Sequence, residues 1–199
     1  MLKRSFDIFF SVIGLILLSP VFLIMAIWIK CDSYGLVFYR QVRVGKNGKN
    51  FLLYKFRSMR VGSDKKGLLT VGERDPRITR SGRFIRKFKL DEFPQLINVL
   101  RGEMSIVGPR PEVPKYVALY NEEQRKVLNV KPGISDWSSI RFRNENELLA
   151  QAEDSEDFYI SDVMPEKLRM NLEYVQENNF WMDIKIIFIT LKKLISKDK

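Results

Sequence analysis

The most prominent pattern in the chain is an uncharged run from Ile8 to Ile29. As a helix this run would be about 33 Å long, enough to cross a bilayer. Ser19-Pro20 lies near its centre, where proline removes a backbone hydrogen bond. Its basic flanking residues are Lys3 and Arg4 before it, and Lys30, Arg40, Arg43, Lys46 and Lys49 after it. Because cytoplasmic flanks are the basic ones, the pattern favours a helix that bends at Ser19-Pro20, dips into the membrane and returns. A kinked helix that spans the membrane is the alternative.

The same run shares only its basic start with a secretory signal. Its apolar core is too long, and Trp28-Ile29-Lys30 occupies the place where cleavage needs small residues. We therefore expect residues 1–30 to be retained as a membrane helix and residues 31–199 to form a cytosolic domain.

Strand patterns follow this helix. Residues 37–44 and 51–56 are rich in strand formers and flank the turn dipeptide Asn47-Gly48, which predicts a β-hairpin. The polar, glycine-rich residues 62–76 predict a loop.

Helical patterns dominate the rest. Apolar residues recur at three- and four-residue spacing over 84–100, with Ser81 as the expected N-cap and Gly102 as the expected stop. Pro94 is tolerated in a first helical turn, so a second helix is expected to begin near Asp91. Residues 115–130 predict an amphipathic helix, and residues 145–179 predict acidic and then mixed helices.

The tail, residues 180–196, places aromatic and aliphatic side chains beside lysines, which is typical of a helix lying on acidic lipid. A terminal helix packed on the core is the alternative. The expected fold class is α/β and mostly helical, with a membrane helix, a small hairpin and amphipathic helices at the membrane surface.

Charge and composition narrow the chemistry. The net charge of +10 calls for an anionic partner: nucleic acid, an acidic membrane surface or a phosphorylated substrate. The apolar run argues against nucleic acid. The single cysteine, Cys31, excludes an internal disulfide, and the absence of histidine excludes imidazole chemistry. Catalysis would have to use carboxylates, Lys, Arg, Tyr, Ser or a metal held by oxygens.

The acidic pair Asp91-Glu92 is the main candidate for chemistry. It follows a basic segment that contains Arg80, Arg83, Arg86, Lys87 and Lys89. These cations are expected to keep both carboxylates ionised, and a helix start suits phosphate. Arg110, on a stiff Pro-Arg-Pro loop, is suited to clamp a phosphate. The structural alternatives are a carboxylate pair that complements a helix dipole and an Arg110 salt bridge to Glu112 or Glu103.

Three strings around these residues resemble a known family. YKFRSM (54–59), DPRITRSGRFIRKFKLDEFPQLINVLRGEMSIVGPRPE (75–112) and KPGIS (131–135) are closely similar to the bacterial sugar transferase family. Its members are small monotopic phosphoglycosyl transferases that begin glycoconjugate and surface polysaccharide assembly on polyprenol phosphate. The resemblance covers nearly the whole chain.

The resemblance implies a mechanism. Asp91 would attack the β-phosphate of a UDP-sugar, release UMP and carry the phosphosugar until polyprenol (undecaprenyl) phosphate takes it. Mg²⁺ would sit near Asp91, and Glu92 would serve as a metal ligand or as a base. The phosphate-binding residues would be Lys55, Arg86 and Arg110. The membrane helix would be re-entrant at Ser19-Pro20, with the catalytic domain on the cytoplasmic face of the bacterial inner membrane. Whether the chain forms a homodimer is left open.

Two departures from the family pattern concern the donor. Where the family usually continues Thr-Gly-Trp-Ala-Gln, this chain has Ser135-Asp136-Trp137-Ser138-Ser139, and Asn171 replaces a family aspartate. Both departures are expected near the sugar and base of the donor. Arg143 is a further candidate for binding the donor there, and the alternative is a surface arginine. The rival function is a membrane-surface adaptor that binds acidic lipids without catalysis.

Overall fold

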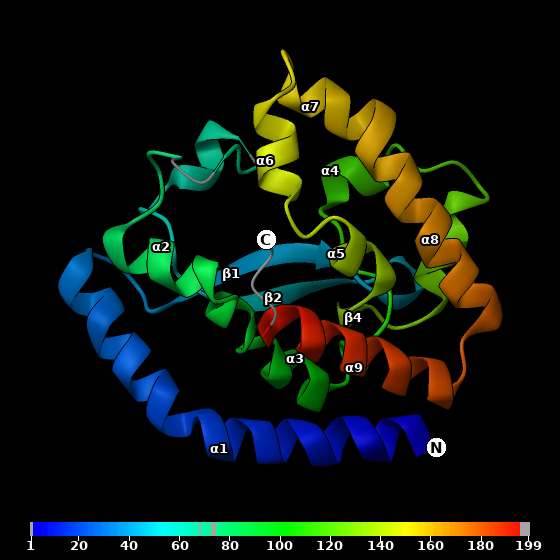
Figure 1. Cartoon of the computed structure of the whole chain (residues 1–199), viewed down its shortest axis with the longest axis horizontal. Coiled ribbons are helices and arrows are strands. Elements are labelled where there is room, and N and C mark those ends of the chain that lie inside the picture. Colours follow the sequence, from blue (N-terminus) through cyan, green and yellow to red (C-terminus); the bar gives the residue numbers. More distant parts are fainter. Residues whose placement is uncertain (1, 68, 73–74, 196–199) are drawn as a thin grey trace.

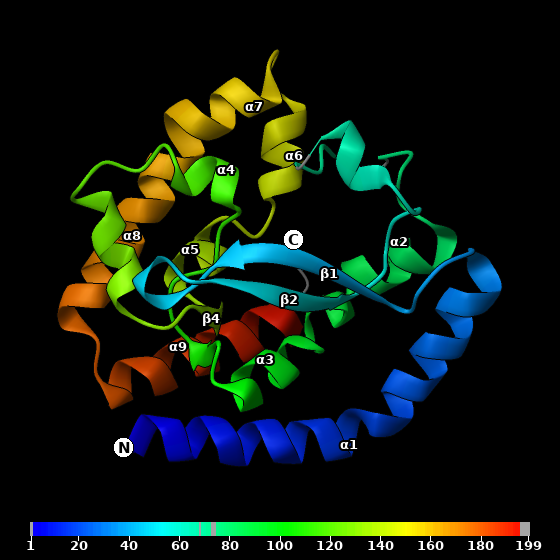
Figure 2. The same cartoon turned by 180° about the vertical axis from the view of Figure 1, so that it is seen from behind.

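The computed structural model describes residues 2–67, 69–72 and 75–195. The long first helix, α1 (Leu2–Asp32), stays helical through Pro20, yet its axis changes direction near its middle (Figures 1 and 2). The Ser19 hydroxyl donates to the Ile16 carbonyl at 2.7 Å, within the turn that a proline ring disturbs. Among the described residues, α1 is the one helix long and apolar enough to cross a membrane. The expected break is therefore a bend within a continuous helix.

The predicted hairpin is confirmed. Strands β1 (Phe38–Val44) and β2 (Asn50–Phe56) pair antiparallel, with Phe38 opposite Phe56. The connecting turn, η1 (Lys46–Gly48), holds Asn47 at φ 57°, a left-handed conformation that asparagine tolerates. A second sheet was not predicted: β3 (Ser105–Val107) pairs parallel with β4 (Gly133–Ser135).

For the described part of residues 62–76 (62–67, 69–72 and 75–76), the loop prediction holds apart from one short 3-10 turn, η2 (Ser63–Lys66). Helix α2 (Arg80–Lys87) follows, and its N-cap is Thr79, whose hydroxyl accepts from the Gly82 amide at 3.0 Å. The Ser81 prediction is therefore wrong. Ser81 is buried and donates through its amide and hydroxyl to Asp32 at the end of α1.

The helix expected to begin near Asp91 begins later. Asp91 and Glu92 belong to a 3-10 turn, η3 (Leu90–Glu92), and α3 (Gln95–Arg101) starts after Pro94. This prediction is wrong because the left-handed Lys89, φ 56°, turns the chain before Leu90. The Gly102 stop is confirmed, with φ 81° at the C-cap.

The single helix predicted over 115–130 is two short ones, α4 (Pro114–Val117) and η4 (Gln124–Asn129). Asn121 and Gln124 exchange side-chain and backbone hydrogen bonds of 3.0 and 2.8 Å, and this closed turn starts a new element. Further helices are α5 (Trp137–Arg141), α6 (Glu145–Ala150), α7 (Ser155–Phe158), the π-turn η5 (Tyr159–Val163), α8 (Met164–Glu177) and α9 (Phe180–Ile195).

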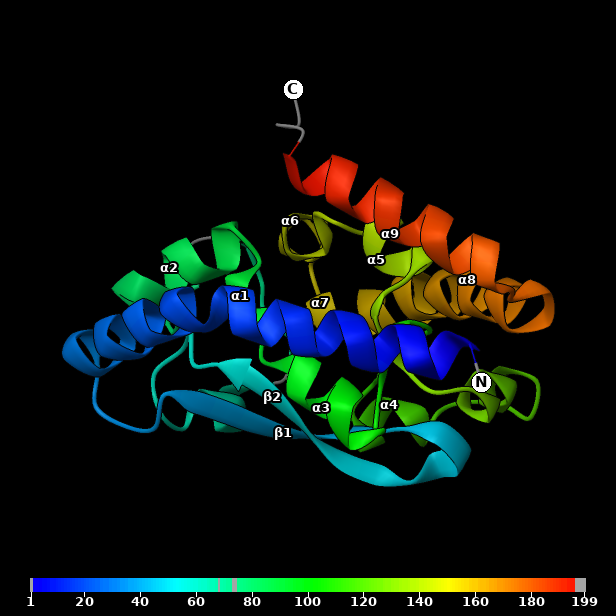
Figure 3. The same cartoon turned by 90° about the horizontal axis from the view of Figure 1, so that it is seen from below.

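The tail helix α9 packs on the core, which was one of the two alternatives for it, and it also has an exposed apolar face. Ile186 is fully buried on one face, while Trp181 and Phe188 are 78% and 68% exposed on another. Figure 3, seen from the side of α1, places the hairpin and α9 on opposite flanks of α1. Ser196, the last residue of the predicted tail helix, lies outside the described residues.

Candidate active site

A cavity of about 1020 Å³ opens between the hairpin, α2, η3, the loop before α4 and α5. Every charged residue proposed from the sequence lines it: Lys55, Arg86, Asp91, Glu92, Arg110 and Arg143. These residues are up to 88 positions apart in the sequence (143 minus 55). The fold therefore brings candidate site residues from distant segments to one cavity.

Asp91 is the buried carboxylate of this cavity, only 7% exposed. Neither of its oxygens accepts a hydrogen bond from any residue in the described part of the chain. Burial raises the pKa of Asp91, although Lys55 opposes that rise. Desolvation outweighs the nearby cations in its effect on this pKa, so the cations do not bring the pKa of Asp91 below its ordinary value.

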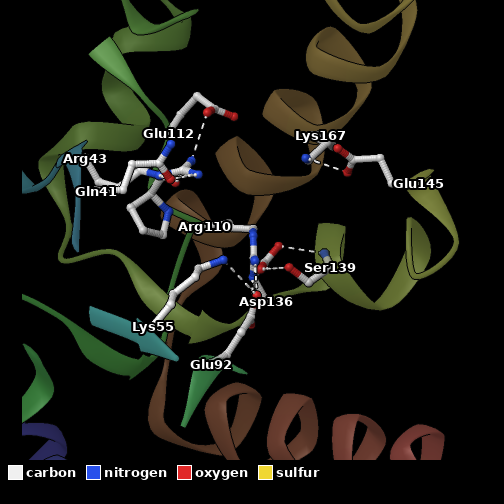
Figure 4. A network of polar contacts seen from close by, with 11 residues as sticks. Gln41, Arg43, Lys55, Glu92, Arg110, Glu112, Asp136, Ser139, Glu145 and Lys167 are labelled. Atoms are coloured by element: carbon white, nitrogen blue, oxygen red, sulfur yellow. Dashed lines mark hydrogen bonds and ion pairs between the residues drawn. The ribbon is translucent and has the colours of Figure 1, made fainter. Parts of the chain in front are cut away.

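Glu92 has the opposite surroundings. Its carboxylate accepts two hydrogen bonds from the Arg110 guanidinium, one of them 3.2 Å from Nη1, and lies 3.4 Å from the Lys55 ammonium. Burial raises the pKa of Glu92, but Arg110 and Lys55 outweigh burial and hold it well below its usual range. Arg110 thus pairs with Glu92, not with Glu112 or Glu103 (Figure 4).

The pKa values of Lys55 and Arg110 both depend on the neighbouring Glu92 carboxylate. Burial lowers the pKa of the Lys55 ammonium, and Glu92 partly restores it. Glu92 raises the pKa of Arg110 further above its usual value. Both side chains are only partly exposed, 18% for Lys55 and 30% for Arg110. They present fixed positive charge to the cavity beside a carboxylate with unused acceptor positions.

A second polar cluster lines the same cavity and was missed from the sequence. The Glu112 carboxylate accepts from Arg43 at 3.0 Å (Figure 4). It also accepts from the Tyr159 hydroxyl at 2.5 Å and from the Val113 amide at 2.7 Å. Lys167 bonds Glu145 at 2.8 Å nearby. The only sequence signal for this cluster was the position of Glu112 directly after the Pro-Arg-Pro loop.

Close backbone contact holds the Pro-Arg-Pro loop in place. A side chain on Gly133 would come within 2.1 Å of the Gly108 amide nitrogen, and one on Gly108 within 2.5 Å of the Lys131 carbonyl. Only glycine fits at both positions. The close parallel contact of β3 with β4 therefore fixes the position of the loop that carries Arg110.

The residues that depart from the family pattern divide into two groups. Ser135 and Ser139 line the cavity, and Asp136 caps α5 by accepting from the Ser139 amide at 2.9 Å. Asn171 is buried in α8 and is not among the lining residues. Arg143 lines the cavity and donates to the Lys193 carbonyl of α9.

The described residues contain no group of three or more Asp, Glu and Cys side chains placed to hold a metal ion. Mg²⁺ is commonly held by one or two carboxylates together with substrate phosphates. Asp91 fits that pattern because its oxygens are free of hydrogen bonds from the described chain. Glu92 fits less well, since Arg110 and Lys55 already occupy it.

Residues 1–197 match the family described as bacterial sugar transferase. The chain is 40% identical over 201 residues to a UDP-glucose:undecaprenyl-phosphate glucose-1-phosphate transferase of Escherichia coli (strain K12), covering 97% of this chain and 40% of the relative. It is 36% identical over 198 residues to a UDP-N-acetylgalactosamine-undecaprenyl-phosphate N-acetylgalactosaminephosphotransferase of Aeromonas hydrophila, covering 98% and 44%.

A relative of similar length also matches. An uncharacterized sugar transferase of Bacillus subtilis (strain 168) is 38% identical over 194 residues, covering 98% of this chain and 87% of the relative. The chain spans less than half the length of the Escherichia and Aeromonas relatives.

Proposed function

Because the chain belongs to the bacterial sugar transferase family, we propose that it is a phosphoglycosyl transferase. It moves a sugar 1-phosphate from a UDP-sugar to undecaprenyl phosphate or a similar polyprenol phosphate. The names of relatives that act on UDP-glucose and UDP-N-acetylgalactosamine support this class of donor and acceptor. Since those relatives differ in the sugar, the proposal covers the donor class.

The observation that carries the proposal is the Asp91 carboxylate, buried at the cavity wall with unused oxygens and cations beside it. In the first step one Asp91 oxygen attacks the β-phosphorus of the UDP-sugar. The bond from that phosphorus to the UMP oxygen breaks, UMP leaves, and the sugar 1-phosphate remains on the carboxylate as an acyl phosphate. Such covalent carriage divides one difficult displacement into two easier ones.

In the second step an oxygen of polyprenol phosphate attacks the same phosphorus. The bond to Asp91 breaks, the carboxylate is regenerated, and the product is a polyprenol diphosphate sugar. Lys55, Arg86 and Arg110 bind and neutralise the phosphates during both steps. Glu92 holds Lys55 and Arg110 in place, a role that its existing contacts support better than a role as base.

Mg²⁺ is proposed as the cofactor, held by Asp91 and the substrate phosphates. When bound, it would neutralise charge on the transferring phosphoryl group. The chain's own residues supply the remaining positive charge and the exclusion of water.

Membrane attachment through α1 gives both substrates one site. A water-soluble UDP-sugar and a lipid phosphate meet only at the membrane surface, and a re-entrant α1 would keep the cavity there, on the cytoplasmic face of the bacterial inner membrane. The outer residues Ile16 and Leu17, 65% and 71% exposed, support contact with lipid.

Pro20→Leu should straighten α1 and move its amino terminus across the membrane. Labelling of a cysteine placed at that terminus measures this change. Periplasmic labelling of the same cysteine in a protein that keeps Pro20 would contradict the re-entrant form.

A membrane-surface adaptor is the competing function, and it needs no cavity with a buried carboxylate. The test is UMP release from a panel of UDP-sugars, with polyprenol phosphate present, by the detergent-solubilised protein. Repeated turnover that depends on one donor and on the acceptor is expected, whereas donor alone should release at most one UMP per protein. No UMP from any donor would favour the adaptor.

A further inference from the structure

The amino-terminal turns of α1 hold two catalytic segments through polar side chains. Asp7 is 3% exposed and lies near the start of α1, directly before the uncharged run. Its Oδ1 accepts from the Ser105 hydroxyl and from the Ile106 amide, both at 3.0 Å. A buried carboxylate needs such donors, and here both come from β3.

These bonds complete the outer edge of β3. On its other edge β3 uses the Ser105 amide to bond the Pro132 carbonyl at 2.8 Å, and the following Gly108 amide bonds Ser135 at 3.1 Å. The Ile106 amide points the opposite way, where a third strand would lie, and Asp7 satisfies it there. Arg110 follows β3 after two residues, so Asp7 fixes the strand from which that arginine extends.

Arg4, one turn earlier, holds the neighbouring segment. Its guanidinium donates to the Val99 carbonyl at 2.6 Å and to the Leu100 carbonyl at 2.9 Å. These carbonyls lie in the last turn of α3, where a cation complements the helix dipole, and the Val99 carbonyl also accepts from the Gly102 amide at 2.9 Å. Asp91 and Glu92 end η3, and α3 begins at Gln95 after two further residues.

One face of α1 thereby connects the two partners of the phosphate clamp. Glu92 precedes α3, and Arg110 follows β3, and the two side chains form their ion pair across the cavity. A shift of α3 against β3 would separate that pair. We propose that Arg4 and Asp7 are positioning residues that keep α3 and β3 in register, so that α1 sets the Glu92–Arg110 pair as well as attaching the chain to the membrane. This inference rests on the proposed function.

The test compares variants of Asp7 with a matched control in the same helix. Asp7→Ala removes the acceptor, whereas Asp7→Asn keeps a carbonyl oxygen in the same place and should rescue. Ser11→Ala is the control, because Ser11 is fully buried on α1 and its hydroxyl has no hydrogen-bond partner in the described residues. We expect kcat for UMP release to fall about ten- to a hundredfold in Asp7→Ala, and to change less than about threefold in Asp7→Asn and Ser11→Ala.

A double-mutant cycle separates positioning from general weakening. If Asp7 acts through Arg110, adding Asp7→Ala to Arg110→Ala should cost far less than Asp7→Ala costs alone. Independent, additive losses would overturn the proposal, as would unchanged kcat in membrane-bound Asp7→Ala. Should Asp7→Ala fail to fold, Arg4→Lys keeps the charge but loses the two-point fork, and the same cycle with Arg110→Ala decides.

Hydrogen exchange keeps this inference distinct from the proposed function. Asp7→Ala should speed amide exchange across residues 105–110, and Asp7→Asn and Ser11→Ala should not, whatever reaction the protein performs. Unchanged exchange would overturn the tie to β3. Failure of wild-type protein to release UMP would count against the proposed function alone.

Discussion

Two clusters of buried carboxylates line the same cavity, and they differ in how their oxygens are used. At one end, Glu112 is bonded by Arg43, Tyr159 and the backbone of Val113. At the other end, Asp91 is more deeply buried than Glu112 but accepts no hydrogen bond from the described chain. A carboxylate with both oxygens bonded to neighbouring groups stabilises the fold, whereas one whose oxygens accept no hydrogen bond from the chain can attack a phosphorus or hold a metal.

The largest effect is expected from Asp91→Asn. The amide has nearly the same shape but cannot form an acyl phosphate, so turnover should fall at least about a thousandfold with little loss of folding. UMP release and the melting temperature measure the two consequences. Asp157→Asn is the matched control, since that exposed carboxylate lies outside the cavity; equal loss in both variants would contradict a special role for Asp91.

Arg110→Ala should cost about a hundredfold in turnover, because one fixed donor to the transferring phosphates is lost. Arg110→Lys should restore part of it, since lysine keeps the charge but not the planar fork. Vesicle sedimentation should show unchanged membrane binding. Arg169→Ala removes an exposed arginine with two surface ion pairs and should leave the rate alone; full activity in Arg110→Ala would reduce its Glu92 contact to a structural salt bridge.

Glu112→Gln tests the braced end and should act mainly on stability. Loss of the carboxylate leaves the half-buried Arg43 charge unpaired, at a cost of about 3 kcal/mol in the free energy of unfolding. Chemical denaturation measures it. A larger fall in kcat than in stability would place Glu112 in the chemistry and end the contrast with Asp91.

The acid dependence of that stability has a defined sign. Burial raises the pKa of Glu112, but Arg43 and Lys167 hold it below the ordinary 4.5, with Tyr159 also facing the carboxylate. The carboxylate therefore stabilises the fold fully above pH 4.5, and its contribution disappears as the pH falls through the lowered folded-state pKa. The stability difference between wild type and Glu112→Gln should shrink in acid.

The smallest effect is expected from Arg143→Ala. Arg143 lines the cavity next to the serines that depart from the family pattern, so the KM for the donor should rise several-fold with kcat nearly constant. Arg141→Ala, on the exposed side of α5, is the control. An unchanged KM would make Arg143 a surface arginine tied to α9.

Local chemistry explains which features were predictable. Asn47-Gly48 and Gly102 adopt left-handed backbone conformations that few other residue types tolerate. These residue types therefore predict the hairpin turn and the end of α3. The β3–β4 pair could not be predicted, because three-residue strands carry almost no periodicity. The competition between Thr79 and Ser81 for the cap was decided by Asp32, which comes from a distant helix.

The same distinction applies to the site. Residue types and spacing pointed to Asp91, Glu92 and Arg110. The family resemblance added Lys55 and Arg86, and Arg143 was a further candidate near the departures from the family pattern. All six line the cavity, together with other charged residues. Whether each carboxylate is occupied depends on partners such as Tyr159 and Arg43, which lie far from Glu112 in the sequence. The opposite directions of the pKa of Asp91 and Glu92, which are sequence neighbours, arise for the same reason.

The central claim is that Asp91 carries the phosphosugar, and the most direct measurement is the mass of the protein after incubation with donor alone. Wild-type protein given its UDP-sugar and Mg²⁺, without polyprenol phosphate, should release UMP and gain one sugar phosphate on the peptide that contains Asp91. Asp91→Asn should gain none. If wild-type protein turns over with both substrates yet is never labelled by the donor alone, the transfer is direct and Asp91 is not the nucleophile.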